Sequence, residues 1–182
     1  ALIAMALLCD PTPPRRLHRT LVDEPVKPLL NKFCAGNPPA PVVLEDLVTP
    51  WEVAGLRHAV MQFPHLFNAT FADRVLVTLQ LILDHHKLLV DGYGTHGVVQ
   101  MVCQMLDIAY TFTANRVFDF KDKIVPLAAL ANHLNTFILN PNQWSSERAT
   151  SPSLIHRYAA RVLSLHPSES MALFAKPEFQ YF

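Results

Sequence analysis

The stretch that decides the fold is Thr70–Val90, TFADRVLVTLQLILDHHKLLV. Its polar side chains follow one line of a helix with 3.6 residues per turn, and nearly every other position is apolar. That line consists of Asp73, Gln80, Asp84, Lys87 and, just beyond the stretch, Asp91. A helix with a single narrow polar stripe must be covered on several sides. The pattern therefore predicts a helix that lies inside a larger helical fold.

A second apolar segment, HGVVQMVCQMLDIAYTF over residues 96–112, follows directly. It also carries one polar stripe at helical spacing, which consists of His96, Gln100, Gln104, Asp107 and Thr111. The two segments are separated by Asp91-Gly92-Tyr93-Gly94, whose glycines favour a left-handed stop at the end of a helix. We therefore expect an antiparallel helical hairpin over residues 70–112, with water along only one edge of each helix.

Start and stop signals outline further helices around this hairpin. The run Thr49-Pro50-Trp51-Glu52 combines an N-cap, a proline at the first helical position and a capping-box Glu, which predicts a helix to about Gln62. Residues 124–139 repeat apolar side chains at helical spacing and end at Asn140-Pro141, while Ser151-Pro152 opens another amphipathic helix.

The remaining segments are expected to connect these helices. The connection over residues 113–122 carries Phe118 and Phe120, and we expect both rings to anchor it to the body of the protein. Residues 42–47 form the single run that favours an extended strand. No hairpin turn joins two alternating stretches, so the sequence does not favour a sheet.

These patterns predict one all-α domain over residues 1–182. It is expected to be either an irregular α-solenoid of HEAT/ARM-like helical hairpins or a multi-helix bundle. No repeat consensus recurs at a fixed period, so a solenoid of this sequence would be a degenerate one. The first residue is Ala and not Met, and we expect the domain to be part of a longer polypeptide or of a larger assembly.

Composition narrows the classes of function. Lys and Arg total 15 and so do Asp and Glu, which disfavours nucleic acid as a partner. Charged residues make up only 16% of the sequence, so we expect partner subunits to cover part of the surface. Cys9, Cys34 and Cys103 are far apart and odd in number, which favours a reducing intracellular compartment. No run approaches the roughly 20 uninterrupted apolar residues of a membrane helix.

One short motif points to chemistry. The run His85-His86-Lys87-Leu88-Leu89-Val90-Asp91-Gly92 resembles the HHxxxDG motif of the chloramphenicol acetyltransferase and condensation-domain superfamily, although four residues and not three separate its two halves. The resemblance implies an acyltransferase that acts on an acyl thioester, with His86 as general base and Asp91 as an orienting group. The alternative is structural: both histidines flank the polar stripe of a helix, where Lys87 can pair with Asp84 or Asp91.

Other chemistries lack a local pattern. None of the nine histidines lies four residues from another, and no paired cysteines or acidic loop occur, so we expect neither a metal nor another cofactor. A small-molecule substrate is not expected either. An RNA-binding helical repeat is a second alternative, but it would need basic residues along one face of a protein whose charges balance.

The preferred hypothesis is a non-catalytic helical scaffold, a structural subunit that holds other proteins in a larger complex. Aromatic residues are enriched where protein interfaces bind most strongly, which makes those near the C-terminus candidates for contact. The candidates are Trp144, Phe179, Tyr181 and Phe182. The last three follow Pro177 in a tail too short to bury itself, so the tail docks either on a partner or on the protein's own helices.

Overall fold

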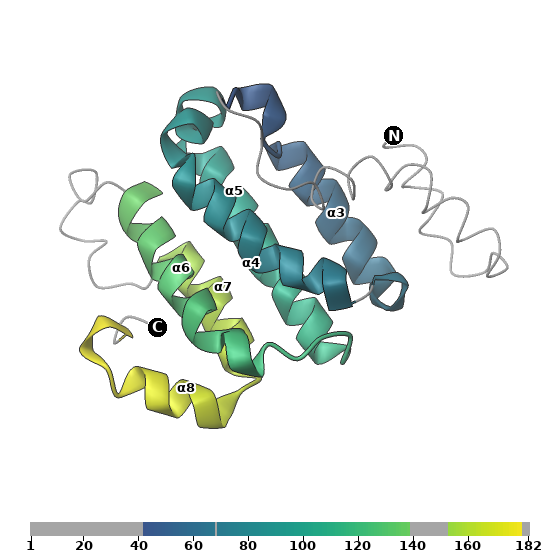
Figure 1. Ribbon diagram of the computed structural model, residues 1–182, viewed down its shortest axis with the longest axis vertical. Helices are drawn as coiled ribbons and strands as arrows, with labels where there is room; N and C mark the ends of the chain where they lie inside the picture. The colour runs from purple at the N-terminus through teal and green to yellow at the C-terminus, as the bar shows by residue number, and fades with distance from the viewer. Residues whose placement is uncertain (1–41, 68, 139–152, 180–182) are drawn as a thin grey trace, which may run out of the picture.

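The computed structural model describes residues 42–67, 69–138 and 153–179. Their helices are α3 (Pro50–Gln62), α4 (Ala69–Asp84), α5 (His86–Ala114), α6 (Ile124–Ile138), α7 (Leu154–Leu163) and α8 (Pro167–Phe174) (Figure 1). Short 3-10 helices occupy Leu44–Asp46, Pro64–Leu66, Lys121–Lys123 and Pro177–Phe179. No strand occurs in these ranges, so the prediction of an all-α fold is confirmed. Across the same residues, none of the helices combines the length and apolar character that a membrane crossing requires.

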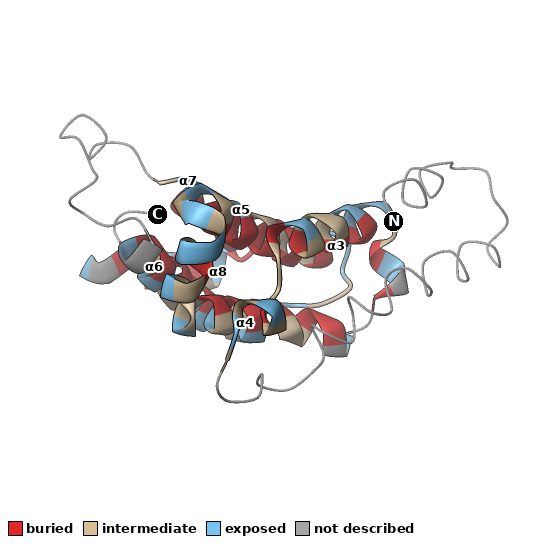
Figure 2. Cartoon of the chain, turned by 90° about the horizontal axis from the view of Figure 1, so that it is seen from above, coloured by how far each residue is buried: buried red, intermediate tan, exposed pale blue. Residues whose placement is uncertain are grey.

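The longer helices lie in two layers, with α5 at the centre. Helices α3, α5 and α7 lie side by side in one layer, and α4 and α6 form the other (Figures 1 and 2). Helix α5 contacts α3 and α7 beside it and α4 and α6 across the interface between layers. The C-terminal half of α5, residues 98–112, is therefore largely buried.

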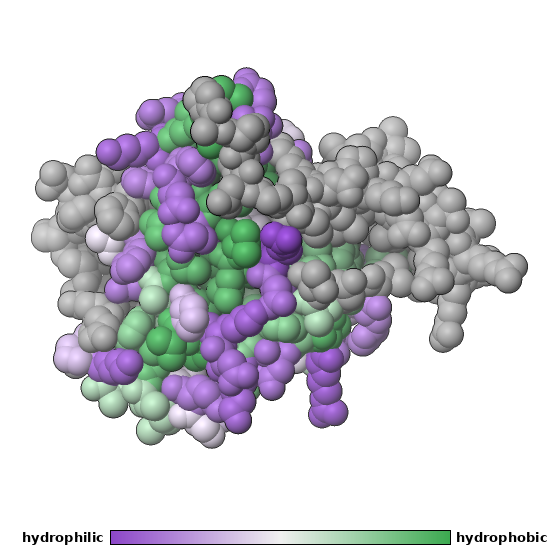
Figure 3. Space-filling model, in the orientation of Figure 1, coloured by the Kyte–Doolittle hydropathy of each residue, from purple (hydrophilic) through white to green (hydrophobic). Residues whose placement is uncertain are grey.

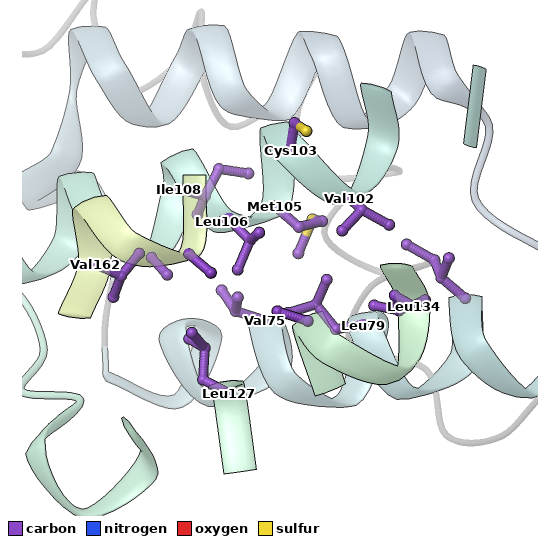
Figure 4. Packing of buried hydrophobic residues seen from close by; sticks show 14 of the residues in the cluster. Val75, Leu79, Val102, Cys103, Met105, Leu106, Ile108, Leu127, Leu134 and Val162 are labelled. Atoms are coloured by element: carbon purple, nitrogen blue, oxygen red, sulfur yellow. The ribbon is translucent and has the colours of Figure 1, made fainter. Parts of the chain in front are cut away.

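Buried apolar side chains fill the space between the layers (Figure 4). Helix α5 contributes the largest share, including Met105, Leu106 and Ile108, each at most 1% exposed. Side chains that meet them from the other helices include Val75 and Leu79 of α4, Leu127 and Leu134 of α6, and Val162 of α7. Removing such surfaces from water is the main favourable contribution to folding.

The predicted helical hairpin over residues 70–112 is present, but its turn differs from the expectation. One helix was expected to continue through Val90, whereas α4 ends at Asp84 and His85 leaves the helical conformation at φ −113° and ψ 21°. The His86 Nδ1–H donates to the carbonyl of Leu83 over 2.7 Å, and this bond competes with the helix for that acceptor. Residues 86–93 then form about two helical turns of the connection.

Gly94 separates these turns from the long part of α5. Its backbone lies at φ 72° and ψ 159°, inside a helix whose other residues are helical. Side chains with a Cβ rarely adopt this region of conformational space, so the position favours glycine. A left-handed stop was predicted within Asp91–Gly94; Gly94 does take a positive φ, but its ψ is extended and α4 has already ended at Asp84.

The two polar stripes have different surroundings. On α4 the stripe faces solvent, and Gln80 and Asp84 are exposed as predicted. On α5 the stripe begins exposed at His96 but ends buried, with Asp107 only 3% and Thr111 only 8% exposed. The expectation of water along the whole second stripe is therefore wrong, because α3 and α7 cover its C-terminal half.

The predicted start of α3 is confirmed in detail. The Thr49 hydroxyl accepts from the Glu52 N–H over 3.2 Å, and the Glu52 carboxylate accepts from the Thr49 N–H over 2.7 Å. These two bonds form the expected capping box, with Pro50 at the first helical position. Residues 42–47 were expected to be extended, but Leu44–Asp46 forms a 3-10 helix in which the Asp46 carboxylate accepts from the Val43 N–H.

Helix α7 begins at Leu154 and not at the predicted Ser151-Pro152, a pair that lies outside the described residues. The Ser153 hydroxyl is its N-cap and accepts from the His156 N–H over 3.1 Å. The His156 ring is buried in the first turn of the helix, and this burial lowers its pKa below the usual value for histidine. The folded protein therefore favours the neutral imidazole.

The connection after α5 is anchored by its aromatic rings, as predicted. Arg116 takes a positive φ of 56°, and the Val117 N–H donates back to the Phe112 carbonyl over 2.8 Å, which ends the helix. The Phe118 and Phe120 rings then meet edge to face at 4.7 Å, and Phe120 is fully buried. Their burial fixes the path of the backbone from α5 to α6.

Replacing Gly94 should measure the free-energy cost of its positive-φ backbone conformation for a residue with a side chain. No atom lies within 4 Å of a Cβ built at this position, so Gly94→Ala introduces backbone strain without a clash. We expect a loss of about 1–3 kcal/mol in the free energy of unfolding, measured by urea denaturation. His96→Ala, at an exposed position of the same helix, is the control and should stay within about 0.5 kcal/mol of the wild type. Equal stability of the two variants would contradict the assignment.

Burial of His156 should make the stability depend on pH. Its lowered pKa means that the unfolded protein binds a proton more readily than the folded one, so stability decreases as the pH falls below about 6.5. We expect His156→Gln to lose less stability between pH 7.5 and pH 5.5 than the wild type does. His133→Gln, which changes an exposed histidine of α6, should keep the wild-type dependence. A His156→Gln profile parallel to the wild type would contradict the role of burial.

Candidate functional site

The histidine pair of the acyltransferase-like motif lies where α4 gives way to α5. Both rings are half-buried, as the structural alternative expects, and the Leu83 carbonyl fixes the His86 proton on Nδ1. Asp91 is exposed, and its five-residue separation from His86 places the two about 140° apart around a helix. The structure therefore does not bring His86 and Asp91 together. Asp84 accepts from the Gln80 amide over 2.7 Å instead of pairing with Lys87.

An aromatic pair marks the start of α3. The Trp51 ring is 73% exposed, and its centroid lies 6.0 Å from that of Tyr93 at a tilt of 53°. Tyr93 belongs to the turn between α4 and Gly94, so this contact joins the first turn of α3 to the hairpin connection. We call Trp51 and Tyr93 the aromatic corner. Its tryptophan is the most exposed of the large apolar side chains in the described ranges.

The surroundings of the aromatic corner favour the neutral form of its phenol. Partial burial raises the pKa of Tyr93 above the usual value for tyrosine, and the nearby Glu52 and Glu45 carboxylates raise it further. The Tyr93 hydroxyl therefore remains protonated and can donate a hydrogen bond. The corner combines a large apolar surface with a polar tip, a combination that is common where proteins contact one another.

The second cluster is centred on Asp107 of α5. The Asp107 carboxylate, 4% exposed, accepts from Arg57 Nε of α3 over 2.6 Å and from Arg161 Nη1 of α7 over 3.0 Å. The guanidinium carbon of Arg161 lies 4.5 Å from the ring centroid of Tyr110 and 5.6 Å from that of Tyr158. We call these five residues the Asp107 clamp. It joins the three helices of one layer.

The carboxylate of the clamp also affects the thiol of Cys103. Burial raises the pKa of Cys103 to about 12, and the Asp107 carboxylate adds to the shift. The thiolate is the nucleophilic form of cysteine, so this side chain is not activated for covalent chemistry. Among the residues the structure describes, no group of three or more His, Cys, Asp or Glu side chains is arranged to hold a metal ion.

Sequence reasoning identified Asp107 as part of a stripe but missed both arginines. Asp107 is the single carboxylate of residues 96–112, and an isolated charge in so apolar a helix is a signal that an opposite charge must meet it. The signal does not say which cation pairs with it. Arg57 and Arg161 lie 50 and 54 positions away, and each occupies an ordinary polar position of its own helix.

The predicted interaction residues have separate outcomes. Phe179 is only 5% exposed and belongs to the core of the described residues, so this ring docks on the protein's own helices, one of the two alternatives expected for the tail. Trp144, Tyr181 and Phe182 lie outside the described ranges. The structure shows two candidate contact features that the sequence did not single out, the aromatic corner and the Asp107 clamp.

Comparison with known proteins identifies no relative of this sequence. No family model matches the sequence, and it matches neither a curated protein nor a solved structure. The roles of its residues are therefore inferred from their own contacts.

Replacing the arginines of the clamp should destabilise the protein more than replacing its carboxylate. Arg57→Met with Arg161→Met leaves a buried carboxylate unpaired, and we expect a loss of about 3–5 kcal/mol in the free energy of unfolding. Asp107→Asn leaves two arginines that still reach water, so we expect a smaller loss of about 1–3 kcal/mol. The control is Asp84→Asn, an exposed carboxylate on α4, which should change stability by less than about 0.5 kcal/mol. A double arginine variant as stable as the wild type would refute the clamp.

Proposed function

We propose that the protein is a non-catalytic helical scaffold that contacts other proteins in a larger complex. The observation that carries this proposal is the aromatic corner, where a tryptophan is 73% exposed at a capped helix start. An exposed Trp beside a Tyr is costly to hydrate and is the kind of side chain on which interface binding energy concentrates. A protein partner that covers this ring would remove that cost.

Other apolar side chains reach the surface as well. On the face that carries α4 and α6, apolar surface runs between groups of polar side chains (Figure 3). The large apolar residues that are exposed in the described ranges are Val43, Trp51, Met61, Val77, Val125, Leu154, Met171 and Phe174. Together with the low charge content of 16%, they support contact with more than one neighbour.

Within the all-α class, we propose a short stack of helical hairpins. In an α-solenoid each hairpin contacts the hairpins next to it in sequence. Hairpin α4–α5 packs on hairpin α6–α7 in this way, because α5 contacts α7 in one layer and α4 contacts α6 in the other. The stack would present α3, with the aromatic corner, at one edge of its layer.

Replacing the exposed tryptophan tests the proposed function. We expect Trp51→Ala to weaken association with protein partners at least about tenfold, because buried aromatic anchors contribute about 2 kcal/mol or more to interfaces. Stability should change by less than about 0.5 kcal/mol, because the ring is exposed in the isolated protein. Association is measured by sedimentation velocity of the purified protein and by quantitative co-purification from the native source.

The matched control is Met171→Ala. Met171 is 72% exposed but belongs to α8, which lies far from the start of α3 (Figure 1). Its loss should leave association at the wild-type level. A protein that stays monomeric and retains no partner would overturn the scaffold proposal. Equal effects of the two substitutions would show that the aromatic corner is not the contact surface.

A further inference from the structure

The Asp107 clamp contains one more positive charge than its own contacts require. Two guanidinium groups meet a single carboxylate, so the net charge of the clamp is 2 − 1 = +1. Each guanidinium has five N–H groups, and each gives one hydrogen bond to Asp107. Within the described residues no second carboxylate forms an ion pair with either arginine. With respect to the described residues, most of the N–H groups of both side chains therefore remain available.

These donors are accessible from solvent. The Arg57 side chain is 35% exposed and that of Arg161 is 50% exposed, whereas the Asp107 side chain beneath them is only 4% exposed. An incoming anion would meet guanidinium groups before it met the carboxylate. The buried carboxylate consequently holds the arginines in place without blocking their outer N–H groups.

The clamp is also organised before any ligand arrives. Arg161 is held on one side by Asp107 and on the other by the faces of Tyr110 and Tyr158. Helix α5, which supplies the carboxylate, is in direct contact with α3 and α7, which supply the two arginines. Much of the rotamer entropy that an arginine loses on binding an anion has therefore already been lost in folding.

We propose that Arg57 and Arg161 together bind one carboxylate of a partner protein, either an Asp or Glu side chain or the partner's C-terminal carboxylate. A single carboxylate matches the net charge of +1, and it accepts N–H groups from both guanidinium planes. A nucleic acid would need a row of cations, and the balanced charge of the protein does not provide one. The Tyr110 and Tyr158 rings give apolar surface on which a peptide can lie.

This inference rests on the proposed scaffold function for its choice of a protein partner, but its test does not. The isotope-labelled protein is titrated with sodium acetate, and the side-chain Nε–H resonances of Arg57 and Arg161 are followed by NMR. Sodium chloride at equal ionic strength is the reference. We expect saturable shifts with acetate and none with chloride, and the capped peptide Ala-Ala-Glu-Ala-Ala should compete while its Gln version does not.

Variants separate the clamp from general surface charge. Arg161→Lys keeps the charge but loses the planar donor group, and Arg57→Lys does the same from α3, so that either variant suffices if the other does not fold. We expect each to weaken acetate binding at least about fivefold. Arg157→Lys is the matched control, since Arg157 is exposed one turn before Arg161 on α7, and it should bind acetate as the wild type does.

Three outcomes would overturn the inference. They are shifts that do not saturate, equal shifts with chloride, and an Arg157→Lys effect as large as that of Arg161→Lys. Tighter binding of inorganic phosphate than of acetate would overturn the choice of a carboxylate and favour a phosphorylated ligand. If acetate does not bind to the clamp, association that depends on Trp51 is still observed. If the protein has no partner, acetate binding is still observed, so the two failures are distinguishable.

Discussion

The enclosure of α5 by four other helices is the constraint on which the rest of the structure depends. A helix covered by α3, α4, α6 and α7 has room for polar side chains only along the seam on its outer face, between its two layer neighbours. Residues 96–112 follow this rule, with apolar side chains everywhere except on one stripe. Where the seam closes, the stripe is no longer hydrated, and its one carboxylate must find cations within the protein. The clamp is therefore a consequence of the way the core is built.

Features that depend on neighbouring residues could be predicted from the sequence. The capping box of Thr49 and Glu52, the start of α6 and the glycine of the hairpin turn each arise from contacts over a few positions. The break at His85 could not, because a helical pattern of apolar residues continues across it, and the His86 side chain takes up the Leu83 carbonyl that the backbone ladder would otherwise use. Hydrophobic spacing describes which face is buried, and it contains no information about that competing acceptor.

The candidate sites were less predictable for a related reason. The motif at His85–Gly92 could be recognised in the sequence, but the helical backbone places His86 and Asp91 on different sides of the helix. The partners of Asp107 come from α3 and α7, and no local pattern connects positions 50 or more apart. The aromatic corner was not predicted, because the sequence around Trp51 indicates only the start of a helix. Whether the ring is exposed depends on which other elements cover that first turn.

One further property of the Asp107 clamp concerns how the helices are placed lengthwise. Apolar surfaces tolerate sliding, because one methyl group serves nearly as well as the next. A shift of α3 or α7 by one helical turn would carry its guanidinium about 5.4 Å along α5, away from the single carboxylate of that stretch. The ion pairs thus give both outer helices the same reference point on the central one. The ion pairs therefore select one lengthwise register of the layer among several that apolar contacts alone would allow.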